Sequence, residues 1–178
     1  VAARSEEPGE TPRLSLAVVY PGEPGVKVEK LPALPLMPDI SHGRLYLDGA
    51  LCELLAGDGW DAYVKPFRTL EDVYVLSAMT AWLYGVGQDS DWPQALQLRL
   101  LALLAGCAEA SRQAPNNPPG HVLLGGLFAQ FEALAGEVDQ ALGNGPVEWA
   151  QMWQRDKGVM QLAAGARAKR LAKALAVT

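Results

Sequence analysis

Residues 92–107 read WPQALQLRLLALLAGC, and in a helix they place leucine on nearly every side. A helix that is apolar all round has to be enclosed by other structure. Helical periodicity continues on both sides of this segment, from about residue 69 to 84 and from 118 to 145. No strand pattern interrupts this part of the chain, which argues against a doubly wound sheet. We predict three helices packed around the leucine-dense middle one.

The last part of the chain is predicted to be a basic amphipathic helix, over about residues 159–176. Residues 155–178 contain six basic residues and one acidic residue, which gives a net charge of +5. The whole chain carries −5, so residues 1–154 carry −10. One side of the helix is mostly alanine. The other side carries Arg167, Lys169, Arg170 and Lys173.

The N-terminal residues have a different pattern. Residues 1–13 are rich in Glu and contain Pro and Gly without apolar periodicity, which predicts a disordered tail. Apolar residues alternate at 14–20 and at 26–30 around the turn sequence PGEPG, which predicts a β-hairpin. Residues 44–47 are a candidate third strand.

A proline-rich strap follows the predicted hairpin. Residues 31–38 read LPALPLMP, with proline at every third position from residue 32 onward, which is the period of a polyproline II helix. Leu31, Leu34 and Met37 then share one edge of an extended segment. We expect that edge to lie on the protein's own body or on a neighbouring copy.

Together these patterns predict a mainly α protein. We expect a single helical bundle of about five to six helices, with a small N-terminal β-hairpin and a proline-rich extended strap. The expected divisions are a disordered tail at 1–13, the hairpin and arm at 14–48, and a helical domain at 49–178. Residues 1–13 lack the apolar core of a secretory signal, and the apolar helix is too short to cross a bilayer. We therefore expect a cytoplasmic protein without a membrane span.

The sequence offers little for catalysis or metal binding. Its two histidines are His42 and His121, and no GxSxG elbow is present to expose a serine nucleophile. Cys52 and Cys107 are far apart and form no CxxC pair. We expect no cofactor, no metal and no catalytic residues, so a role other than catalysis is favoured. One alternative keeps a small-ligand or enzyme site near Asp39 and His42.

The leading hypothesis is a non-enzymatic protein–protein interaction or assembly module that associates with itself. The edge formed by Leu31, Leu34 and Met37 is one candidate interface. Gly125 and Gly126 lie opposite the apolar stripe of their helix, where the close approach of another helix, from this chain or a second copy, would justify them. The other candidate interface residues are the aromatic pair Trp149 and Trp153.

The competing hypothesis is a nucleic-acid-associated accessory or regulatory protein. Its basic helix would contact phosphates through Arg167, Lys169, Arg170 and Lys173. Four neutralised phosphates would make the affinity for duplex DNA fall with salt at a log–log slope of about −3.6.

Overall fold

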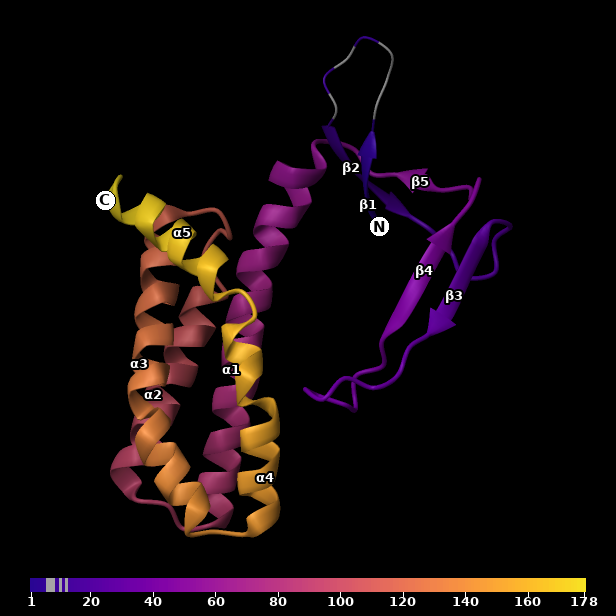
Figure 1. The fold of residues 1–178 in the computed structure, drawn as a ribbon. Coiled ribbons are helices and arrows are strands. Elements are labelled where there is room, and N and C mark those ends of the chain that lie inside the picture. Colours follow the sequence, from indigo (N-terminus) through magenta and orange to yellow (C-terminus); the bar gives the residue numbers. More distant parts are fainter. Residues whose placement is uncertain (6–8, 10, 12) are drawn as a thin grey trace. The chain divides into compact units, whose positions relative to one another are not determined.

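The computed structural model describes residues 1–5, 9, 11 and 13–178 (Figure 1). The chain divides into two compact units, Val1–Phe67 and Arg68–Thr178. The strands all lie in the first unit, and helices build most of the second. The mainly helical class and the small antiparallel β element predicted from the sequence are confirmed. The boundary between the units lies after residue 67, whereas the sequence pattern placed it at residue 49.

Five α-helices follow one another in the described chain. Helices α1 to α4 run alternately up and down, as the short connections between them require, and α5 crosses α3 (Figure 1). A π-helical turn (Trp60–Val64) leads into α1, and a 3-10 turn (Lys157–Gln161) precedes α5. The helix bounds are α1 Lys65–Asp89, α2 Gln94–Ala110, α3 Pro118–Gly143, α4 Val147–Asp156 and α5 Ala164–Leu175.

The leucine-dense segment forms α2, and one of its faces lies at the centre of the core. Leu96, Leu100 and Leu103 are almost fully buried and pack in one cluster with apolar residues of α1, α3 and α4. The other leucine face is open, with Leu98 57% exposed and Leu101 46% exposed. The expectation that this helix is enclosed on all sides is therefore wrong, because its neighbours cover one side of it.

Helix α1 begins earlier than the sequence pattern predicted. It starts at Lys65, directly after the π-helical turn, and carries Pro66 as its second residue. Thr69, at the predicted start of this helix, is of the residue type that often caps a helix, but it lies inside the helix and is buried. Glu71 and Asp72 follow Thr69 at positions where acidic residues are common in the first turn of a helix. In the structure Asp72 instead binds residues of α5.

Helix α1 also ends later than predicted, at Asp89, because its glycines do not terminate it. Gly87 lies inside the helix where Trp92 packs against it. A Cβ at residue 87 would lie 3.0 Å from Cε3 of Trp92, and the backbone N–H of Trp92 donates to the oxygen of Gly87 at 2.9 Å. This glycine therefore admits an indole ring.

The first unit holds two antiparallel sheets within its described residues. One has the strand order β1-β2-β5, with β1 at Ala2–Ser5, β2 at Arg13–Val18 and β5 at Glu53–Leu54. The other pairs β3 (Val26–Lys30) with β4 (Gly43–Leu47).

Two N-terminal expectations are corrected by the first sheet. Residues 2–5 form a strand and not part of a disordered tail, because β2 offers them an edge to pair with. Residues 6–8, 10 and 12 of the predicted tail lie outside the described residues. Residues 49–56, assigned to the helical domain, are not helical, since Glu53 and Leu54 pair with the other edge of β2.

The predicted pairing of 14–20 with 26–30 is wrong. Residues 26–30 pair instead with 43–47, with Val26 opposite Leu47 and Lys30 opposite Gly43. The segment 31–42 is therefore the loop of a hairpin. A local turn signal suggested the nearer partner, but the ladder forms with the more distant one.

This loop interrupts the polyproline II helix expected for the strap. Leu31 N–H donates to the oxygen of His42 at 2.9 Å, which closes the loop at its base. Met37 has a φ of 48°, and its oxygen accepts from Ile40 N–H at 3.0 Å, so the chain turns there. Leu34 is exposed, whereas Leu31 and Met37 are partly buried. The loop has to reverse the direction of the chain so that β4 returns beside β3. A continuous polyproline II helix over residues 31–38 would not make that reversal.

Candidate functional site

A buried carboxylate links the first helix of the bundle to the last. The side chain of Asp72 on α1 is 5% exposed and accepts hydrogen bonds from two guanidinium groups of α5. Arg167 Nη1 lies 3.1 Å from Oδ1, and Arg170 Nη2 binds Oδ2. Arg167 also donates to the oxygen of Met160 and lies over the Phe128 ring, 4.0 Å from its centroid. Since a buried charge has to be paired and hydrogen-bonded, this cluster fixes α5 on the bundle.

The cluster changes the interpretation of the basic helix. The sequence placed Arg167, Lys169, Arg170 and Lys173 together on one face for binding phosphates. In the structure Arg167 and Arg170 turn inward to Asp72, while Lys169 and Lys173 stay exposed. Two neutralised phosphates in place of four would reduce the expected salt slope to about −1.8.

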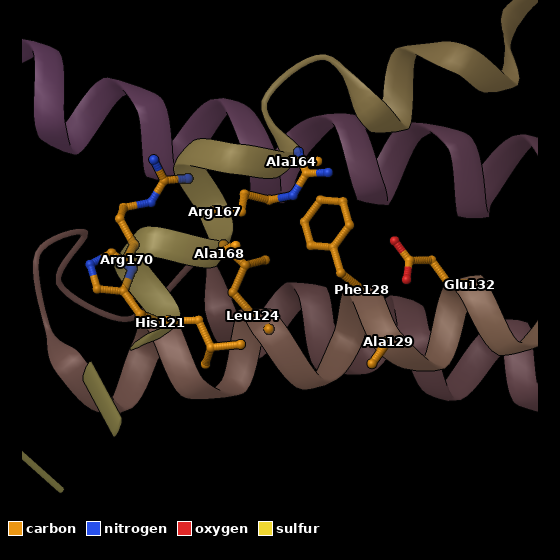
Figure 2. Close-up of a pocket in the computed structure, with 11 residues that line it drawn as sticks. His121, Leu124, Phe128, Ala129, Glu132, Ala164, Arg167, Ala168 and Arg170 are labelled. Atoms are coloured by element: carbon orange, nitrogen blue, oxygen red, sulfur yellow. The ribbon is translucent and has the colours of Figure 1, made fainter. Parts of the chain in front are cut away.

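A pocket of about 260 Å³ lies beside the cluster, between α3 and α5 (Figure 2). His121 and Arg170 lie together at one end of it. Glu132 lies on α3 about three turns further along and is exposed. Apolar side chains from both helices line the space between these ends. They are Leu124, Phe128, Ala129, Ala164, Ala168 and Leu171.

Gly125 is explained by the packing of α5 on α3. A Cβ at this position would lie 2.9 Å from Cδ1 and Cδ2 of Leu171. The close approach expected at Gly125 is thus made by another helix of the same chain. A Cβ at Gly126 would have no atom of a packed neighbour within 4 Å. The packing of α5 on α3 therefore does not explain Gly126.

We expect His121 to make the stability of the bundle sensitive to pH. Burial lowers the pKa of His121, the charge of Arg170 lowers it further, and Asp72 opposes them. The unfolded state then binds more protons than the folded state once the pH falls below the ordinary histidine pKa of 6.5, so the unfolding free energy decreases as the pH falls. We expect the urea midpoint to drop between about pH 7 and pH 5, with a smaller drop in His121→Gln. Equal drops in the two proteins would contradict this role of His121.

Trp153, a candidate interface residue, is part of the core. It is 3% exposed, its ring stacks 6.4 Å from that of Trp82, and it meets Phe131 edge-on at 6.3 Å. Its Nε1 donates to Oδ1 of Asp139 at 2.6 Å. Trp149 is partly buried and lies edge-on to Trp82 at 6.2 Å. Both indoles therefore stabilise the packing of α4 on the bundle.

The hairpin of β3 and β4 has one apolar face. Directly opposed residues of an antiparallel pair share a face, so Val26 and Val28 point the same way as Leu47 and Leu45. Val28 is 64% exposed, Leu45 43% and Leu47 44%. We call these four residues the apolar hairpin face.

The opposite face of the hairpin is polar and internally bonded. Tyr46 Oη donates to Oε2 of Glu29 at 2.7 Å, and Arg44 Nη1 donates to Tyr46 Oη at 3.3 Å. Lys27 Nζ lies over the Tyr46 ring, 5.8 Å from its centroid. These groups suit contact with water.

The described residues of the first unit do not bury apolar side chains as the helical core does. Among the described residues, the buried apolar side chains run from Val73 to Ala174 and none belongs to 1–67. A hairpin with only two strands and an uncovered apolar face is marginal in water. The hairpin would therefore gain stability from a surface that covers its apolar face.

Asp39 and His42, the candidate residues of a small-ligand or enzyme site, both lie in the loop between β3 and β4. Asp39 is exposed and His42 is half-buried, with its Nδ1 buried and lacking a hydrogen-bond partner in the structure. No cluster of three or more His, Cys, Asp or Glu side chains suited to a metal occurs in the described part of the chain. Cys52 is exposed, and burial raises the pKa of the Cys107 thiol.

Comparison with known proteins gives no indication of function, so the candidate sites come from the structure alone. No family model, no curated protein and no solved structure matches the chain. None of the helices described has the length and apolarity needed to cross a bilayer. Two features remain as candidate sites: the apolar hairpin face and the pocket between α3 and α5.

Proposed function

We propose that this chain is a self-associating assembly module in which the apolar hairpin face packs against the same face of a second copy. The observation that carries the proposal is the exposure of Val28, Leu45 and Leu47 in a unit where no described apolar side chain is buried. Contiguous apolar surface of this kind marks contact sites on soluble proteins. A second copy would cover it without changing the helical bundle.

The symmetry of the contact supports a second copy as the occupant. A twofold contact brings the same residues of both copies together, so an aliphatic face meets an aliphatic face. Lys30 lies at the end of this face beside the hairpin loop. When two hairpins pack antiparallel, the two Lys30 side chains lie at opposite ends of the contact and do not repel each other.

The polar face of the hairpin fits the same arrangement. Its side chains are hydrogen-bonded to one another, so they stay in water when the apolar face is covered. The proposal also includes a reducing, cytoplasmic setting, which the unpaired Cys52 and Cys107 favour.

The test compares the association state of two charge variants. Val28→Lys combined with Leu45→Lys places two ammonium groups in the proposed contact, and Leu98→Lys is the control at an exposed leucine of α2. In sedimentation equilibrium at about 50 µM, we expect the native chain and Leu98→Lys to be dimers. The double variant should be a monomer, because burying an unpaired charge is unfavourable.

Circular dichroism of all three proteins checks that the helical unit stays folded. A native chain that remains monomeric up to about 200 µM would overturn the proposal. So would a double variant that dimerises as strongly as the native chain, or a Leu98→Lys variant that loses the dimer to the same extent.

A further inference from the structure

The pocket between α3 and α5 adjoins the buried cluster of Asp72, Arg167 and Arg170. Arg167 and Arg170 bring two guanidinium groups to the single carboxylate of Asp72. The three side chains are mostly buried, with 14%, 22% and 5% of their surface exposed. Glu132 also lines the pocket, but it lies about three helical turns from His121 along α3. Two guanidinium groups therefore share one buried carboxylate, while the other acid that lines the pocket, Glu132, is exposed.

The pocket is apolar next to this cluster. Leu124 and Phe128 of α3 face Leu171 of α5 across it, and Figure 2 shows Phe128 further along the pocket than His121 and Arg170. Ala164 and Ala168 have short side chains, which leaves about 260 Å³ open. Pockets for drug-sized ligands measure about 300–1,000 Å³. This pocket therefore suits a smaller molecule.

We propose that the pocket binds a small monocarboxylate with an apolar tail, its carboxylate at Arg170 and its tail along Leu124 and Phe128. Hydrogen bonds between a guanidinium group and a carboxylate are strong because both partners are charged. The ring of His121, at the same end, supplies a further N–H donor. This binding is separate from the proposed self-association, since every lining residue belongs to the helical unit.

The charge and the shape together select the ligand class. A carboxylate with a tail can accept from the guanidinium group of Arg170 and also fill the apolar part, whereas phosphate leaves the apolar part empty. A neutral alcohol with the same tail fills the apolar part but offers the guanidinium group no anion. Both the carboxylate and the tail are therefore needed.

Octanoate is the probe for this site, with 1-octanol and inorganic phosphate as comparison ligands. In isothermal titration with the full chain, we expect octanoate to bind with a Kd on the order of 0.1 mM. The two comparison ligands should bind at least about tenfold more weakly, since each lacks one of the two recognised features.

Two variants of α5 locate the binding. Ala168→Leu fills the pocket but keeps the arginines, and we expect it to weaken octanoate binding about tenfold or more. Lys169→Gln removes an exposed cation of the same helix and should leave the affinity unchanged. Circular dichroism checks whether both variants are folded.

Three results would overturn the proposal. The first is no heat and no rise in melting temperature with octanoate at concentrations in the millimolar range. The second is Ala168→Leu binding octanoate as the native chain does. The third is phosphate or 1-octanol binding as tightly as octanoate, because the pocket would then not recognise a carboxylate with a tail.

Discussion

The Asp72→Ala variant is expected to lose about 3–5 kcal/mol of unfolding free energy. The substitution removes a carboxylate that is 5% exposed and leaves the guanidinium groups of Arg167 and Arg170 mostly buried without it. An ion left alone in such a place keeps its desolvation cost but loses the attraction that offset it. Since domains of this size are stable by about 5–15 kcal/mol, the loss is a large share of the total.

Urea unfolding followed by circular dichroism measures this loss. Dilute protein keeps association from adding to the stability. Glu71→Ala is the matched control, because Glu71 is the neighbouring residue on α1 and is exposed; it should change the unfolding free energy by no more than about 0.5 kcal/mol. Equal midpoints for Asp72→Ala and Glu71→Ala would show that the cluster does not hold α5.

A third variant distinguishes the cost of leaving two buried guanidinium groups without their carboxylate from the cost of lost packing. Replacing Asp72 by Leu together with Arg167 and Arg170 by Met removes all three charges and keeps apolar bulk. Such replacements of buried ion clusters are often neutral or stabilising, so this protein should be more stable than Asp72→Ala. If it is less stable, packing and not charge accounts for the loss.

The second large effect is expected for Leu100→Ala, at about 2–5 kcal/mol of unfolding free energy. Leu100 is 0% exposed and lies in the middle of the α2 face that meets the other helices. Truncation removes buried methyl groups and leaves a cavity that the surrounding helices fill only in part.

Leu98→Ala provides the comparison on the same helix. Leu98 is 57% exposed, and alanine is at least as good a helix former as leucine, so the change should be small. The urea midpoints of the two variants at equal protein concentration give the difference. Similar losses would mean that α2 is not buried on one side, and the fold described above would be wrong.

Long periodic segments could be predicted from the sequence because their signal is local. Asn117 and Pro118 mark the start of α3, and the glycines after Leu142 mark its end, as the structure confirms. The predicted start of α1 at residue 69 is wrong, because Thr69 and the acidic residues after it resemble the first turn of a helix, whereas the helix begins at Lys65. Asp72 is acidic for a different reason, since its partners lie on α5.

Partners far apart in the chain could not be predicted from a local pattern. The contact of Arg170 with Asp72 joins residues 98 apart in the sequence. One available signal was that Asp72 stands four residues before the buried Leu76, on the apolar side of its helix. The pairing of 26–30 with 43–47 had no such sign, because alternation shows that a segment is a strand but not which strand it joins.

The meeting of Asp72 with two arginines has a consequence for recognising relatives of this chain. A neutral residue at position 72 would be tolerated only where positions 167 and 170 had changed as well, so the three positions should vary together among related sequences. The pattern to look for is an acidic residue early in the first long helix together with two basic residues, one helical turn apart, in the last helix. It would identify distant relatives even where other aliphatic residues replace the leucines.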